Sequence, residues 1–183
     1  MEIKASLSIR QANVQDAPAI AELDKGAFGP EVAWPVDSFR AALSDSSSDA
    51  QLALLDDKPV GYVLLNYGGA QPNVDSIAVS AEARGHKIGE RLLLGGLERA
   101  AQRGCPSVTL QVEQGNAPAE KLYAKYGFVP SKILPGYYHG KDGTEMTLAE
   151  LQSARNKAFL AERHTELLAA MGSFPQSKVT VSG

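Results

Sequence analysis

The sequence predicts an α/β fold in which a mixed, mostly antiparallel central sheet is flanked by helices. Three observations predict it. Segments with helical and strand periodicity follow one another as two early helices, a strand meander and strand–helix–strand units. The 183 residues have about the length of one domain, and 44% of them are hydrophobic, which is enough for one core. A change of composition near residue 148 separates an expected domain over 1–148 from a helical extension and tail over 149–183.

The first half of the chain predicts two helices and a strand meander. The expected elements are an edge strand over 7–12, a helix over 17–27, a second helix to about 43, and hairpin strands over 51–55 and 59–67. Asp16 and Asp37 stand where each helix should begin, and aspartate is a preferred N-cap residue. The serine- and aspartate-rich run 44–49 is expected to be a surface loop.

The second half predicts strands that alternate with helices. The expected elements are strands over 74–79, 107–113, 128–134 and 144–148, with helices over 88–103 and 117–126. Leu92, Leu93 and Leu97 recur at helical spacing, and Gly104 stands where that helix should stop. Residues 147–150 match a capping box and predict a last helix to about residue 171. This helix could pack on the domain, pack on a second subunit or stay exposed, and a short β-like run follows at 179–181.

Composition excludes several classes of protein. The net charge of −3 and the lack of a dominant basic stretch disfavour a nucleic-acid binder, and no run of about 18 apolar residues predicts a membrane span. The chain start has no apolar signal-peptide core, and Cys105 is the sole cysteine, so a reducing, cytoplasmic location is expected. No histidine pairs visibly with Cys105, so a structural role is expected for it, and the three histidines show no metal-ligand spacing.

An anion site is predicted between the strand 74–79 and the helix 88–103. The turn from Arg84 to Gly89 carries two glycines and two basic residues, Arg84 and Lys87, and opens into a helix N-terminus. Free backbone N–H groups and the positive end of the helix dipole converge at such a point. The turn therefore suits a phosphate group.

This order of elements resembles the GNAT superfamily of N-acetyltransferases. Arg84, Gly85 and Gly89 match the family pattern that holds the pyrophosphate of acetyl-CoA, whereas Lys87 stands where the family usually has glycine. A second segment looks like the family's other signature, namely Leu110-Gln111-Val112-Glu113 followed by Asn116, Ala119, Leu122, Tyr123, Gly127 and Phe128. The resemblance extends over about residues 9–148.

Two further segments are similar to the branch that acetylates protein N-termini. Gly136-Tyr137-Tyr138 is followed by Asp142 and Met146, and Ala27-Phe28 is followed by Trp34-Pro35 and Phe39. The closest likeness is to bacterial ribosomal-protein alanine N-acetyltransferases. The resemblance implies that the substrate side of the cleft is formed by Trp34, Asp75, Gln111, Tyr137 and Tyr138. It implies acetyl-CoA contacts from Ile77, Ala78, Val79, Arg84, Gly85, His86, Lys87, Ile88, Gly89, Glu90, Asn116 and Tyr123.

Several of these residues also have plain structural interpretations. Asn116 could simply cap a helix, and the ring of Tyr123 could pack against the sheet. The Tyr137–Tyr138 pair and Trp34 could be packing residues. Lys87 is tolerable if its backbone is helical, and its ammonium could then add to phosphate binding. If the turn instead needs a positive φ at Lys87, affinity for the cofactor should suffer.

Acetyl transfer to an amine needs a base for the amine and a proton for the leaving thiolate. Tyr123 is the predicted acid, because the family places a tyrosine beside the sulfur and a phenol with a pKa near 10 can donate to a thiolate. The base is open, because this chain has Gln111 where the ribosomal-protein enzymes have glutamate. Glu113 lies two residues along the same sheet face, roughly 7 Å away, and Asp75 or a water chain could serve instead.

The prediction is an N-acetyltransferase that moves acetyl from acetyl-CoA directly to a primary amine, most simply a protein or peptide N-terminal α-amino group. One alternative is a small amine acceptor, such as a polyamine, an amino acid or an aminoglycoside. A second alternative follows from Gln111 and Lys87, which could mark a non-catalytic acyl-CoA-binding module. No metal, nucleic acid or membrane is expected to take part, and a homodimer is left open.

Overall fold

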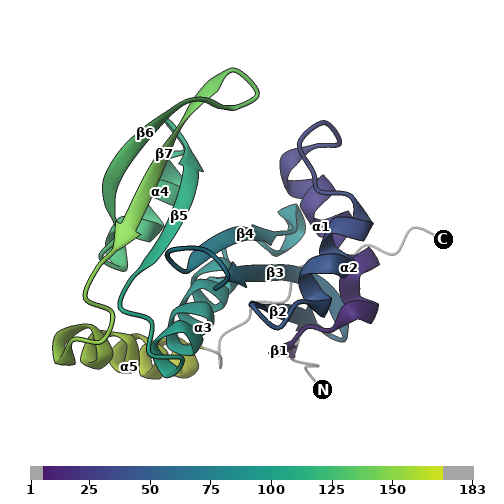
Figure 1. Cartoon of the computed structure of the whole chain (residues 1–183). Coiled ribbons are helices and arrows are strands. Elements are labelled where there is room, and N and C mark those ends of the chain that lie inside the picture. Colours follow the sequence, from purple (N-terminus) through teal and green to yellow (C-terminus); the bar gives the residue numbers. More distant parts are fainter. Residues whose placement is uncertain (1–5, 171–183) are drawn as a thin grey trace.

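The computed structural model describes residues 6–170, which form one seven-stranded sheet with helices on both faces (Figure 1). The strands are β1 (Leu7–Gln11), β2 (Ser48–Leu55), β3 (Lys58–Asn66), β4 (Asn73–Val79), β5 (Val108–Glu113), β6 (Val129–Tyr138) and β7 (Lys141–Leu148). The helices are α1 (Ala17–Phe28), α2 (Val36–Ser44), α3 (Ile88–Gln102), α4 (Ala117–Lys125) and α5 (Ala154–Ala169), with short 3-10 turns η1 (Val14–Asp16) and η2 (Ala81–Ala83). The predicted α/β class is therefore confirmed.

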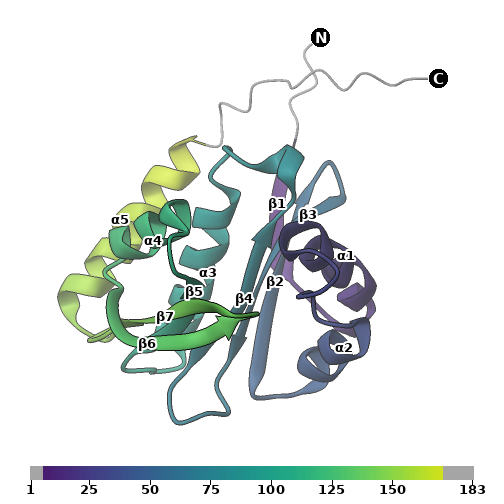
Figure 2. The same ribbon diagram turned by 90° about the horizontal axis from the view of Figure 1, so that it is seen from above.

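The sheet runs in the order β1-β2-β3-β4-β5-β7-β6. Every neighbouring pair is antiparallel except β4 and β5, which are parallel and joined through α3. Helices α1 and α2 cover one face, while α3, α4 and α5 lie on the other (Figure 2). The sheet is thus mixed and mostly antiparallel, as the sequence predicts.

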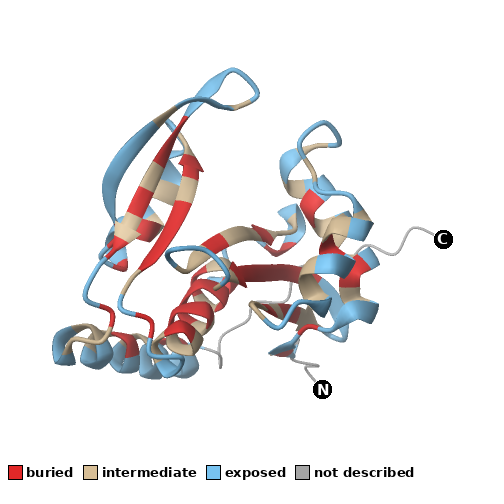
Figure 3. Cartoon of the chain, viewed as in Figure 1, coloured by how far each residue is buried: buried red, intermediate tan, exposed pale blue. Residues whose placement is uncertain are grey.

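Each face of the sheet has its own apolar core, and burial is densest along α3 and the inner strands (Figure 3). On the first face Ile20, Phe39 and Tyr62 are almost fully buried. The core on the opposite face is built from α3, the strands and α4, and it includes Leu65, Leu92, Leu93, Leu97, Leu110 and Phe128. The leucines of α3 all point into this core because they recur at helical spacing.

Two strands separate in the middle of the sheet. β4 and β5 pair only at Asn73 with Thr109 and at Val74 with Leu110, and beyond that point they diverge (Figure 1). β4 also carries a bulge, since Leu65 faces Val74 and Leu64 faces Ser76, so that Asp75 faces no residue of β3. The outer edge of β4 from Asp75 onward therefore offers backbone groups that neither neighbouring strand uses fully.

The helix starts differ from the predicted caps because tertiary contacts claim the predicted residues. Asp16 directly precedes α1 but makes no side-chain cap; its carboxylate pairs with Arg10 at 2.8 Å, and it accepts the Asn13 N–H instead. Asn13 is the actual cap, of the short turn before α1. Asp37 lies inside the first turn of α2, where it pairs with Arg40 rather than capping the helix.

Two boundaries also differ. β2 already begins at Ser48, inside the run predicted as a loop, because it pairs with the far end of β3. Thr147 does not start the last helix, because it lies in β7 opposite Thr109 of β5. Ser153 caps α5 instead, its hydroxyl accepting the Asn156 N–H at 3.2 Å. Helix α3, by contrast, ends as predicted, with Gly104 following at a left-handed φ of 76°.

Helix α5 packs against the domain. Leu160 and Leu167 are buried in the same core as α3, and Arg91 of α3 donates to the Leu167 carbonyl oxygen at 2.5 Å. The predicted β-like run at 179–181 lies outside the described residues. None of the helices within residues 6–170 has the length and apolar character needed to cross a membrane.

Candidate active site

The predicted anion turn lies beside the split between β4 and β5. β4 ends at Val79, η2 follows, and the turn then reaches α3 at Ile88. No side chain caps the start of α3, so the first-turn N–H groups stay open to a ligand. Gly85 has a left-handed φ of 81°, which glycine adopts without strain. The uncapped start of α3 and the β5-facing edge of β4 thus lie at the two ends of the η2 turn, whose own N–H groups at Ala83 and Arg84 already donate to backbone carbonyls.

Lys87 is the cap residue of α3 and has a φ of 59°. A side chain in this left-handed region costs roughly 1–2 kcal/mol, whereas glycine adopts it freely. Of the two alternatives that the sequence left open for Lys87, the structure shows the positive φ, so the lysine is strained.

Two further side chains of the turn contact the end of β4 and η2. The Arg84 Nε donates to the Val79 carbonyl oxygen at 3.2 Å, which leaves the rest of its exposed guanidinium beside the turn. The His86 Nδ1 lies 3.3 Å from the Ala83 carbonyl oxygen. Gly89 faces Val79, where an added Cβ would make only ordinary contact, 3.5 Å from Val79 Cγ2.

The side chains of four predicted cofactor residues point elsewhere. Glu90 is buried, and its Oε1 accepts from Lys125 at 2.7 Å and from Arg163 at 2.6 Å. Ile88 and Ala78 are buried in the two cores, and Ile77 packs toward the α3 side. For these residues only the backbone can face a cofactor, because their side chains are committed to packing or to ion pairs.

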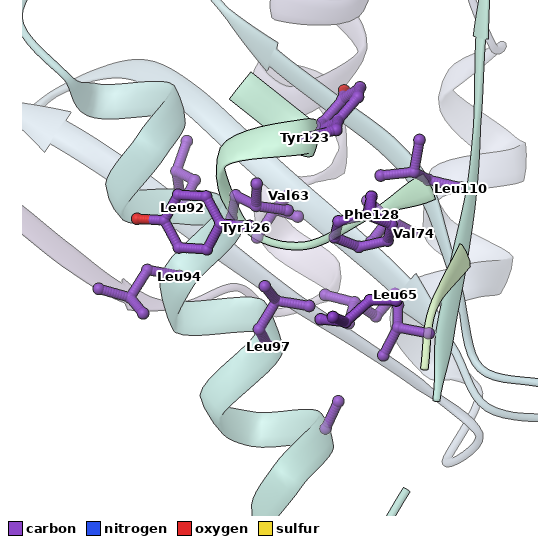
Figure 4. Packing of buried hydrophobic residues seen from close by; sticks show 14 of the residues in the cluster. Val63, Leu65, Val74, Leu92, Leu94, Leu97, Leu110, Tyr123, Tyr126 and Phe128 are labelled. Carbon is purple, nitrogen blue, oxygen red and sulfur yellow. The ribbon is translucent and has the colours of Figure 1, made fainter. Parts of the chain in front are cut away.

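Tyr123 of α4 reaches the same split from the α3 side of the sheet. Its ring packs on Phe128 with centroids 6.0 Å apart, and it lies at the edge of the core cluster with its hydroxyl pointing away from Leu97 (Figure 4). Burial raises the pKa of Tyr123 to about 12. Among the described residues its hydroxyl has no hydrogen-bond partner, yet it is not among the fully enclosed polar atoms. The phenol is therefore protonated at neutral pH and still within reach of a ligand.

Asn116 caps α4, its Oδ1 accepting the Ala119 N–H at 3.4 Å. The interpretation of Asn116 as a helix cap is therefore correct. Within residues 6–170 its amide nitrogen donates to no protein group, so the same side chain retains two donors for a ligand.

The tyrosine pair lies at the end of β6, with ring centroids 5.0 Å apart. Burial raises the pKa of Tyr138 well above its usual value, and the nearby Tyr137, Tyr123 and Glu113 add to the shift. Tyr138 is thus the member that shares an environment with Tyr123 and Glu113, whereas Tyr137 is 55% exposed. The Glu113 carboxylate is already paired, with the Lys141 Nζ at 2.7 Å.

A polar network lines the opposite face of the split. Gln111 donates to Asn73 Oδ1 at 3.1 Å and to Glu145 Oε2 at 3.4 Å, and Asn73 donates to Asp75 at 2.7 Å. Glu145 lies directly opposite Gln111 in the β5–β7 register. The sequence-based prediction missed Glu145, because only the sheet register brings a residue 34 positions away beside Gln111.

A buried carboxylate holds the loop that carries Trp34. Asp24 is 2% exposed and accepts the Trp34 backbone N–H at 2.7 Å. It also accepts the Tyr62 hydroxyl, which lies 2.6 Å from the Ser76 hydroxyl of β4. The Trp34 ring packs on Phe39 at 5.6 Å and remains 38% exposed. The network was not predicted either, and it ties the α1–α2 loop to β3 and β4.

These observations define the site and its limits. Asn73 joins Asp75 to Gln111 across the split, and Tyr138 lies near Tyr123 and Glu113. A separate cavity of about 320 Å³ lies between β1, α3 and α5, and no predicted site residue lines it. Among residues 6–170 no group of three or more His, Cys, Asp or Glu side chains is placed to hold a metal ion.

The fold and the site define a GNAT acetyltransferase, and comparison with known proteins agrees. The model of the acetyltransferase (GNAT) family matches residues 17–128, so the chain belongs to this family. It is an acetyl-CoA-dependent N-acetyltransferase.

Individual relatives are similar over most of their length. The chain is 26% identical over 147 residues to a Bacillus subtilis protein assigned as a ribosomal-protein bS18-alanine N-acetyltransferase, covering 79% of this chain and 96% of that one. It is 30% identical over 142 residues to an N-acetyltransferase of Methanocaldococcus jannaschii, covering 76% and 88%. The solved ribosomal-protein-S18-alanine N-acetyltransferase of Escherichia coli shares the fold, with a TM-score of 0.73, 21% identity, and coverage of 82% and 98%.

Proposed function

We propose that the protein transfers acetyl from acetyl-CoA to the α-amino group of a protein or peptide N-terminus, in one direct step within a ternary complex. The observation that carries the proposal is the split between β4 and β5, with Tyr123 on one face and the Gln111 network on the other. The ribosomal-protein names of the relatives support the same class of acceptor. We place the reaction in the cytoplasm, where a buried free thiol such as Cys105 is stable.

The described residues fit acetyl-CoA, which when bound supplies an activated acyl thioester. The free start of α3 suits the diphosphate, with the charges of Arg84 and Lys87 beside it. The unpaired edge of β4 from Ile77 to Val79 suits the amide groups of an extended pantetheine chain, which can pair with a strand edge as a peptide would. Asn116 adds two amide donors at the start of α4.

Tyr123 is the proposed acid. Its pKa of about 12 keeps the phenol protonated in neutral solution, so it holds a proton for a leaving thiolate. Its hydroxyl is not engaged by another described residue, so no hydrogen bond has to break before it donates.

Besides Asp75, whose carboxylate accepts from Asn73 at 2.7 Å, three routes remain for the proton of the attacking amine. Glu113 shares an environment with Tyr138, but its carboxylate is paired with Lys141. Glu145 offers a carboxylate through Gln111 and so stands nearest the position of the family's glutamate. A water chain along this polar face is the third route, and in that case the site chiefly positions an amine that is already free.

The shape of the acceptor side favours a peptide over an enclosed small amine. The α1–α2 loop with Trp34 and the β6–β7 hairpin with Tyr137 project on either side of the split (Figure 1). Both aromatic residues are substantially exposed, as are Phe28 at the end of α1 and Val32 in the loop that follows. Exposed aromatic residues on both sides of the split suit an extended chain with an apolar side chain near its end.

The test is release of free CoA from acetyl-CoA with a panel of acceptors. Peptides with different first residues should give turnover, and polyamines or aminoglycosides should give much less. Faster turnover with the small amines would refute the peptide assignment. Binding of acetyl-CoA without turnover on any acceptor would instead identify a non-catalytic acyl-CoA-binding module.

A further inference from the structure

We propose that helix α5 is part of the cofactor site, with Arg163 acting as a positioning residue through Glu90. The inference rests on the proposed function and extends it to a helix that begins well after the family-matched residues 17–128. It follows from an ionic cluster between three helices, from the place of Glu90 in α3, and from the charge that each member carries.

The cluster is centred on one carboxylate oxygen. Glu90 Oε1 accepts from the Lys125 Nζ at 2.7 Å, from the Tyr126 hydroxyl at 3.1 Å and from the Arg163 Nη2 at 2.6 Å. The side chains of Glu90 and Arg163 are only 9% and 14% exposed. Phe159 of α5 also packs on the Tyr126 ring, with centroids 5.7 Å apart. The start of α3, the end of α4 and the middle of α5 are thus joined at one buried point.

The two helices that α5 contacts through this cluster, α3 and α4, both carry residues of the proposed cofactor site. Glu90 lies in the first turn of α3, directly after Gly89 of the anion turn. Lys125 and Tyr126 follow Tyr123 by two and three residues on the helix that Asn116 caps. The cluster therefore sets how the anion turn lies relative to the proposed acid, and this relative position must match the span between the diphosphate and the thioester.

The charge of the cluster points to the same role. A carboxylate in the first turn of α3 stands close to the place proposed for an anionic diphosphate and would repel it. Lys125 and Arg163 both pair with Glu90 and offset its charge, while Glu166 pairs with the other Nη atom of Arg163. Without Arg163 the buried Glu90 carboxylate keeps only the Lys125 and Tyr126 donors. Arg163 thus stabilises the geometry of the turn and makes its field more favourable to an anion.

The test compares Arg163→Met with Arg155→Met, which removes an exposed arginine from the same helix. Arg163→Met should raise the acetyl-CoA KM and Kd on the order of tenfold, in the usual range for coupling between neighbouring sites. Because Tyr123 itself is unchanged, kcat should fall less, and Arg155→Met should leave both constants as in wild type. Glu90→Gln combined with Arg163→Met should bind acetyl-CoA more tightly than Arg163→Met alone, because a carboxylate that has lost its arginine partner no longer stands near the diphosphate.

A milder variant and a second readout cover a loss of folding. Arg163→Lys keeps the charge but loses the planar fork, and it should fall between wild type and Arg163→Met. In both variants the amides of the first α3 turn should exchange with solvent faster than in Arg155→Met. Unchanged KM, Kd and exchange in Arg163→Met would overturn the inference, as would an equal loss in Arg155→Met. Failure of the wild type to bind acetyl-CoA would refute the cofactor site itself, while the exchange rates would still decide whether Arg163 holds α3.

Discussion

Replacing Tyr123 by phenylalanine separates catalysis from packing at this position. The ring packs on Phe128 and fills the edge of the core, and the substitution keeps that contact. The hydroxyl has no hydrogen-bond partner among the described residues, so its removal breaks no interaction within them. The free energy of unfolding should therefore change by no more than about 0.5 kcal/mol.

The catalytic effect should be much larger than the effect on stability. A positioned general acid contributes typically about 10²–10⁴-fold to a rate, and each factor of ten corresponds to about 1.4 kcal/mol. Removal of the hydroxyl should therefore lower kcat by about 10²-fold or more, which is at least about 2.7 kcal/mol of transition-state stabilisation. The Kd for acetyl-CoA should change little, because the proposed phosphate and pantetheine contacts lie on α3 and β4.

Tyr67 provides a matched control. Its hydroxyl is also without a partner among the described residues, and burial likewise raises its pKa to about 12. It lies against Arg103 at the opposite end of α3 from the anion turn. Tyr67→Phe should leave kcat unchanged. Comparison of the two variants therefore shows whether the effect depends on where the lost hydroxyl lies.

The assay measures kcat from CoA release at saturating peptide and acetyl-CoA, with Kd and thermal unfolding measured on the same samples. A kcat for Tyr123→Phe within a factor of about two of wild type would refute the acid assignment and leave Tyr123 as a packing residue. An equal fall in kcat for Tyr67→Phe would show that the loss is not specific to the site.

Four further expectations concern the turn, the base and the ionic cluster. Arg84→Glu should weaken acetyl-CoA binding in a direct titration, because an anion would face the diphosphate; equal affinity would remove this turn as the phosphate site. Lys87→Gly should relieve the left-handed strain and, after the greater freedom of the unfolded chain is subtracted, raise the free energy of unfolding by up to about 1 kcal/mol in denaturant titrations; a lower stability than wild type would contradict the strain. In kcat/KM against pH, Gln111→Glu should raise the rate near neutrality if the base has been lost, whereas Glu113→Gln should abolish most activity only if Glu113 has replaced it. Burial alone would raise the pKa of Glu90, but the hydrogen bonds of the cluster outweigh burial and hold this pKa below its usual value. The carboxylate therefore stabilises the fold above about pH 4.3 and loses this effect as the pH falls. The difference in stability between wild type and Glu90→Gln should narrow in acid, and a constant difference would contradict the assignment.

Local signals predicted those parts of the fold that depend on near neighbours in the chain. The apolar spacing of α3 and the left-handed Gly104 after it both lie within one element, and both are found where expected. The caps at Asp16 and Thr147 were wrong for a tertiary reason. Arg10 engages the first side chain, and pairing with β5 places the second in a strand.

The residues of the candidate site also differ in whether neighbouring sequence alone could predict them. Motif residues such as Gly85, Gly89 and Tyr123 could be named because their spacing along the chain carries the signal. Glu145 and Arg163 could not be named, because each meets its partner only through sheet register or helix packing between distant segments. The strain at Lys87 was foreseeable only as an alternative, since its φ depends on how the turn enters α3.

The most direct test uses a peptide that carries both a free α-amino group and an internal lysine. After incubation with the protein and acetyl-CoA, tandem mass spectrometry locates the added acetyl group. The account predicts one acetyl group on the α-amino nitrogen, formed in proportion to released CoA, and no product when that nitrogen is blocked. Acetylation of the lysine alone, or of polyamines but never of the peptide, would contradict it.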